Sequence, residues 1–132
     1  MNTLAFSGYG VVGQEDSASA DKLREITRQY IDLMDKECNK FWLWQKQFII
    51  QKESPSQEDL AQHRDTLKWL LRATRLIQML VSDPDFPDHS LRGQIEAIIW
   101  SLQESWEMIY NSMPEQEARK TLAEVFPDEQ GA

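Results

Sequence analysis

This chain has very little cysteine and histidine, and it has no long hydrophobic run. Cys38 is the single cysteine among 132 residues, so the chain can form neither an internal disulfide nor a cysteine-based zinc site. No stretch reaches the roughly 18 apolar residues that a membrane-spanning helix needs. With two histidines and no serine-elbow motif or paired inward carboxylates, no catalytic constellation can be assembled. We therefore expect a non-enzymatic protein without a cofactor.

Basic residues are also scarce relative to acidic ones. The chain has 14 Lys and Arg against 22 Asp and Glu, a formal net charge of -8. Such a surface repels phosphate backbones and anionic lipids, which disfavours nucleic acid as a partner and argues against a membrane. The N-terminal stretch "MNTLAFSGYGVVGQEDSASA" lacks the basic flank and apolar run of a secretion signal. We expect a cytoplasmic location.

What the sequence does contain is apolar residues spaced by three and four, the period of amphipathic helices. One pattern extends from Asp21 to Lys52, a second begins near Ser54, a third runs from Leu91 to Ser112, and a short fourth follows Pro114. Ser54, Ser90 and Ser112 are the expected N-caps. The first stripe contains Leu23, Ile26, Tyr30, Leu33, Met34, Cys38, Phe41, Trp44 and Phe48.

Short connections between consecutive long helices favour antiparallel neighbours. The sequence therefore predicts an all-α fold: an antiparallel up-down-up three-helix bundle with a long first helix, a short fourth helix and a flexible N-terminal tail. Residues 1–20 form the tail, which contains Gly and Ser and can pack on the bundle. Residues 21–126 form the single bundle domain, and residues 127–132 are a frayed C-terminus.

Several large apolar side chains fall outside the stripes, beginning with the segment "FWLWQKQFII" at residues 41–50. They are Trp42, Leu43, Ile49 and Ile50 in the first helix, Trp69, Leu76 and Leu80 in the second, and Trp100 in the third. Because contiguous apolar patches of this size are uncommon on monomers, we predict that at least one is a homodimer or partner interface. The alternative is intramolecular cover. It would come from Leu122, Val125 and Phe126 of the fourth helix and from Leu4, Phe6, Tyr9, Val11 and Val12 of the tail.

A row of cations follows one flank of the second helix: Arg64, Lys68, Arg72 and Arg75. One interpretation is a solvated flank paired with acidic groups of a neighbouring helix such as Glu96, Glu104 or Glu107. Other interpretations are a docking surface for an acidic partner and a nucleic-acid surface.

Other motif-like strings have structural explanations that require no functional role. "GYGVVG" at residues 8–13 has glycine spacing typical of dinucleotide binding, but no βαβ pattern surrounds it, and we read a glycine-rich tail. We interpret His63 as a core-edge histidine and Cys38 as a buried, inert thiol. The loop from Asp83 to His89 carries oxygen ligands for a metal, although turn chemistry explains the same residues.

These patterns predict a helical protein–protein interaction module, of adaptor, chaperone or immunity type, that self-associates or binds another protein. Two alternatives remain open. The first is a nucleic-acid-associated protein that uses the flank from Arg64 to Arg75. The second is a metal- or ligand-binding bundle that uses the loop from Asp83 to His89.

Overall fold

The computed structural model describes residues 14–51 and 55–127, with side chains described from residue 18 onward. Helix α1 (Gln14–Gln45) passes directly into a π-helix, η1 (Lys46–Ile50). Helices α2 (Gln57–Val81), α3 (Leu91–Tyr110) and α4 (Glu115–Val125) follow. The described part is helical and contains no strand, so the all-α prediction is confirmed. The "GYGVVG" string and the five apolar tail residues lie outside the described residues.

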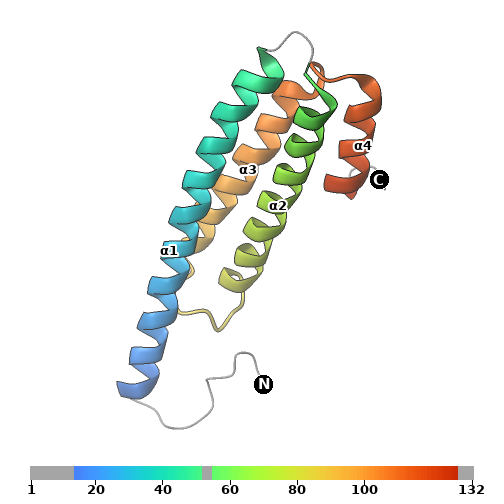
Figure 1. Cartoon of the computed structure of the whole chain (residues 1–132). Coiled ribbons are helices and arrows are strands. Elements are labelled where there is room, and N and C mark those ends of the chain that lie inside the picture. The colour runs from blue at the N-terminus through green and yellow to red at the C-terminus, as the bar shows by residue number, and fades with distance from the viewer. Residues whose placement is uncertain (1–13, 52–54, 128–132) are drawn as a thin grey trace.

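Helices α1, α2 and α3 lie side by side, and each contacts the other two (Figure 1). The C-terminal end of η1 and the N-terminal end of α2 are at one end of this assembly, and the loop between α2 and α3 is at the other. Helix α4 packs against α2. The 32 residues of α1 span about 48 Å at 1.5 Å per residue, and its N-terminal part extends past the loop between α2 and α3.

The sequence predicts a core stripe of Leu60, Leu67, Leu70, Leu71, Thr74, Ile77 and Val81 in α2, and one of Ile95, Ile98, Ile99, Leu102, Trp106, Ile109 and Tyr110 in α3. Both stripes are largely correct. In α2 the buried members are Leu60, Leu67, Leu70, Leu71, Thr74 and Val81, while Ile77 is half-buried. In α3 the buried members are Ile95, Ile98, Ile99, Leu102, Trp106 and Ile109, while Tyr110 is half-buried. In both helices the buried apolar residues recur at helical spacing, which explains why hydrophobic periodicity locates the core face although His63 and Thr74 of α2 are also buried.

Three members of the N-terminal half of the stripe predicted for α1 are wrong, although Leu23 and Met34 do pack in the core. Ile26, Tyr30 and Leu33 are 41%, 55% and 46% exposed, and the face that packs in the core instead includes Thr27 and Ile31. Thr27 can be buried because its hydroxyl donates a hydrogen bond to the backbone carbonyl of Leu23 at 2.8 Å. The spacing of apolar residues alone cannot identify a core face that also contains polar residues.

The placement of Ile49 outside the core is also wrong, because Ile49 is only 1% exposed. At 100° per residue it would lie about 80° from Phe41, off the core face. The backbone N–H of Gln51 instead donates to the carbonyl of Lys46 at 3.0 Å, the i to i+5 bond of a π-helix. Each residue of a π turn rotates by a smaller angle, so Ile49 returns to the same face as Phe41.

Helix boundaries differ from the predicted caps. Helix α1 begins at Gln14, so the predicted boundary between residues 20 and 21 lies inside it. The N-cap of α2 is Ser56 rather than Ser54, and its hydroxyl accepts from the backbone N–H of Asp59 at 3.0 Å. Ser90 makes no side-chain cap at α3. Helix α4 likewise begins after Pro114 without a side-chain cap.

Candidate functional site: a ridge on α2 and a groove between α1 and α3

A buried polar cluster connects the three long helices at one level of the core. Gln45, at the end of α1, accepts a hydrogen bond from Nε2 of His63 at 2.8 Å and donates to Oγ of Ser105 at 2.6 Å. His63 and Gln45 are both fully buried, so the expectation of a core-edge histidine is wrong. Burial lowers the pKa of His63 to about 4, and its ring centroid lies 5.1 Å from that of Phe41. At neutral pH this cluster is uncharged and holds the helices in register.

The four cations predicted to follow one flank of α2 differ in their surroundings. Arg64 forms an ion pair with Glu117 of α4, and its Nε lies 3.6 Å from Oε1 of Glu124. The partners are therefore on α4, rather than the predicted Glu96, Glu104 or Glu107. The side chains of Arg64 and Glu117 are 14% and 8% exposed, so this pair is part of the internal packing. Arg64 is thereby removed from any docking surface.

The remaining cations stay beside an exposed apolar row. Within residues 14–51 and 55–127, no ion pair involves Lys68, Arg72 or Arg75. Trp69, Leu76 and Met79 are 52%, 66% and 70% exposed. Trp69 and Leu76 are seven residues apart and share one face of the helix. We call these six residues, Lys68, Trp69, Arg72, Arg75, Leu76 and Met79, the α2 ridge.

The other apolar residues that were predicted to lie outside the core differ in how far they are exposed. Leu80 is half-buried and packs against the core. Leu43 and Ile50 are 65% and 37% exposed, whereas Trp42 is half-buried. The patch expected at residues 42–50 therefore does not form as one surface. Helix α4 packs on α2, with the ring of Phe126 5.6 Å from that of Trp106.

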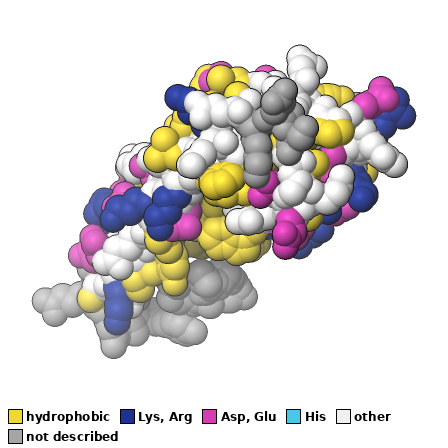
Figure 2. Space-filling model, turned by 45° about the horizontal axis from the view of Figure 1, so that its top comes forward, with side chains coloured by type: hydrophobic (Ala, Val, Ile, Leu, Met, Phe, Trp, Pro, Cys, Tyr) yellow, Lys and Arg dark blue, Asp and Glu magenta, His cyan; other side chains and the backbone are white. Residues whose placement is uncertain are grey.

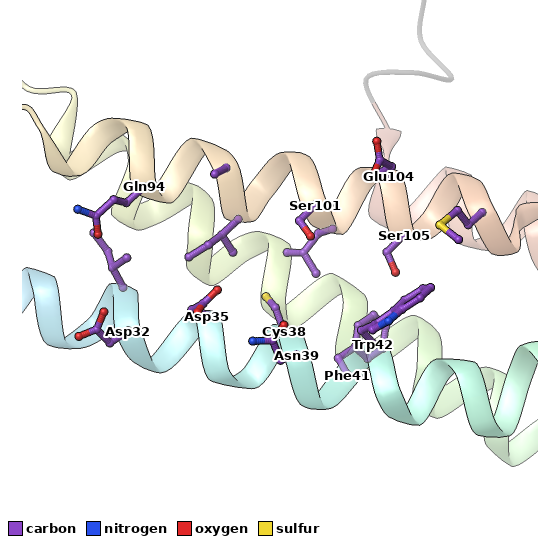
Figure 3. Close-up of a pocket in the computed structure, with 15 residues that line it drawn as sticks. Asp32, Asp35, Cys38, Asn39, Phe41, Trp42, Gln94, Ser101, Glu104 and Ser105 are labelled. Atoms are coloured by element: carbon purple, nitrogen blue, oxygen red, sulfur yellow. The ribbon is translucent and has the colours of Figure 1, made fainter.

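A groove of about 560 Å³ separates part of α1 from α3 (Figure 3). Its residues are Ile31, Asp32, Asp35, Cys38, Asn39, Phe41 and Trp42 of α1, and Gln94, Ala97, Ile98, Ser101, Leu102, Glu104, Ser105 and Met108 of α3. In Figure 3 Asp35 and Trp42 point toward α3, while Glu104 is on the outer side of α3. Three lining residues are acidic and none is Lys, Arg or His. We call this cavity the α1/α3 groove.

Cys38 lies on the wall of this groove. Burial, together with the nearby carboxylates of Asp35 and Glu37, raises the pKa of its thiol to about 12. The thiolate is the nucleophilic form of cysteine, so the thiol is unreactive at neutral pH. This agrees with the interpretation of an inert thiol, although the side chain is half-buried rather than fully buried.

The sequence did not predict the groove, although it carries a signal for it. Ile31, Asp35, Cys38 and Trp42 recur at intervals of four, three and four, so they share one helix face. This face mixes carboxylates with large apolar groups, a composition that fits neither a dry core nor an ordinary solvated surface. Figure 2 shows hydrophobic side chains at the surface among charges of both signs.

The loop between α2 and α3 uses its acidic residues for turn contacts. Asp83 accepts from the backbone N–H of Asp85 at 2.8 Å. Asp88 accepts from the backbone N–H of Ser90 at 3.0 Å, and it lies 3.7 Å from Nε of Arg24 on α1. Hydrogen bonds from Ser90 and the charge of Arg24 lower the pKa of Asp88. No group of three or more His, Cys, Asp or Glu among the described residues could hold a metal ion.

Scans against protein-family models, curated proteins and solved structures each find no match to this chain. Within the described helices, none has the length and apolar character required to cross a membrane. The physical properties of the ridge and the groove therefore carry the functional argument.

Proposed function

We propose that this chain is a non-enzymatic, cytoplasmic helical module for protein–protein interaction that self-associates through the α2 ridge. Its framework is an antiparallel up-down-up bundle of three helices with a long first and a short fourth helix. The exposure of Trp69, Leu76 and Met79 along one helix carries the proposal. Tryptophan and other large apolar side chains are the residues that most often anchor interfaces, because their burial removes much surface from water.

The charges of the ridge support a specific interface. Lys68, Arg72 and Arg75 lie beside the apolar row and have no ion-pair partner within the described part of the chain. Charged groups at the edge of an apolar contact select partners of opposite sign and disfavour others. An acidic molecule with a net charge of -8 repels its own copies unless such local cations meet local carboxylates.

The test is a double substitution, Trp69→Ser with Leu76→Ser, compared with Trp100→Ser. Trp100 is 61% exposed on α3, so it controls for the loss of an exposed tryptophan away from the ridge. Sedimentation equilibrium should show that the double variant associates at least about thirtyfold more weakly, since two anchor side chains are lost, while Trp100→Ser retains wild-type association.

Circular dichroism must show unchanged helix content in both variants, because all three side chains are exposed. Equal association by the wild type and the double variant would show that the ridge is not the interface.

A further inference from the structure

The structure contains a surface that complements the ridge in both shape and charge. We propose that the α2 ridge of one copy docks into the α1/α3 groove of a second copy. This inference rests on the proposed self-association and adds the identity of the opposing surface. Ridge and groove are different parts of the molecule, so each contact is head to tail. Two copies can make it reciprocally in a closed dimer, or it can continue to further copies.

The dimensions of the two surfaces match. The ridge extends from Lys68 to Met79, and the α1 wall of the groove extends from Ile31 to Trp42. Each segment rises through eleven residues, or about 16 Å. The groove volume of about 560 Å³ is within the usual range for sites that enclose a drug-sized ligand, so it can accept bulky side chains.

The apolar parts of the two surfaces also correspond. Phe41, Ile98 and Leu102 line the groove as buried residues, so its inner surface is apolar. Docking would bring Trp69 and Leu76 out of water against this surface. A helix whose apolar row occupies a hydrophobic groove is a recurrent mode of protein recognition.

The ridge and the groove carry charges of opposite sign. The α1 wall carries Asp32 and Asp35, and no cation lines the groove. The ridge supplies Lys68, Arg72 and Arg75, so the two surfaces attract each other despite the negative charge of the whole molecule. Within one copy, α4 already combines apolar contacts with an ion pair from Arg64 to Glu117 as it packs on α2.

The experiment mixes two variants that each lack one surface. The ridge variant is Trp69→Ser with Leu76→Ser, and the groove variant is Asp32→Lys with Asp35→Lys. The control for charge is Asp85→Lys with Glu107→Lys, which changes the net charge equally at exposed positions outside the groove. Light scattering after size exclusion gives the mass of each variant and of an equimolar mixture.

The head-to-tail contact predicts that each single-surface variant alone has the monomer mass of 15.5 kDa. Their mixture should form a complex of twice that mass, because one intact ridge meets one intact groove and no further copy can add. The wild type and the charge control should associate alike. Both should stop at the dimer if two copies close the contacts between them, and both should form larger oligomers if the contacts continue to further copies.

Two other outcomes overturn the inference, and they can be distinguished. If the ridge variant is monomeric but the groove variant still associates like the wild type, the ridge contacts a surface other than the groove, and only the proposed function survives. If the wild type itself is monomeric at all concentrations, proposed self-association and head-to-tail contact are both wrong.

Discussion

Single buried polar side chains decide how the helices of this molecule align. Gln45 and His63 are fully buried yet hydrogen-bonded to each other, and Gln45 also reaches Ser105. A buried polar group without its partner costs about 1 to 3 kcal/mol, so alternative helix alignments that break these bonds are disfavoured. The Nδ1 atom of His63 has no hydrogen-bond partner, and it is the atom that would take up a proton in acid.

His63 should make stability depend on pH in a definite direction. Its folded pKa of about 4 lies below the ordinary value of 6.5, so the unfolded state binds more protons between these values. The contribution is complete above pH 6.5 and is lost as the pH falls to 4, by about 3 kcal/mol in total. Urea unfolding of His63→Gln should show a flatter pH dependence across this window.

The matched control is His89→Gln, because His89 is the second histidine and is exposed. It shows how far replacing a histidine with glutamine changes the free energy of unfolding outside the core. A His63→Gln variant that keeps the wild-type slope would show that His63 does not titrate on unfolding.

Glu117 should be important for stability although it is charged. Glu117→Gln removes the charge that balances the buried Arg64, and losing one partner of a buried pair costs about 3 kcal/mol. The control is Glu96→Gln, which breaks an exposed pair with Arg92 at 3.4 Å and should cost no more than about 0.5 kcal/mol. Urea denaturation measures both, and equal losses would contradict an internal role for the pair.

At the scale of helices, prediction succeeded where apolar spacing defines the packed face. The stripes of α2 and α3 were largely correct, because apolar residues recur along the whole packed face of each helix, even though α2 also buries His63 and Thr74. Helix α1 differs, because Thr27 and Gln45 occupy core positions and the π turn rotates Ile49 inward. Exposure of Trp69 and Leu76 followed from the period of α2, whereas the groove depends on the separation of two helices, which no single-helix pattern contains.

Because of the π-helix η1, we predict that alanine substitutions at two nearby apolar residues change the free energy of unfolding by different amounts. Ile49→Ala should lower the free energy of unfolding by about 2 to 5 kcal/mol, because Ile49 is 1% exposed. Leu43→Ala should change it by no more than about 0.5 kcal/mol, since Leu43 is 65% exposed. Chemical denaturation distinguishes them, and a neutral Ile49→Ala would show that η1 does not turn this side chain into the core.

At the scale of the whole molecule, the stabilising contacts lie apart from the surfaces proposed for association. The hydrogen bonds of the buried cluster around His63 connect α1, α2 and α3, and the Arg64–Glu117 pair connects α2 and α4. Trp69, Leu76 and Met79 stay exposed on α2, and a groove with acidic residues lies between α1 and α3. Large exposed apolar groups on a folded monomer favour association, since their burial is the main source of binding free energy.

The most direct test of self-association is the absolute mass of the wild-type chain by light scattering after size exclusion, across a hundredfold range of concentration. Self-association predicts a mass that exceeds 15.5 kDa and rises with concentration until association is complete. A mass of 15.5 kDa throughout the range would contradict it.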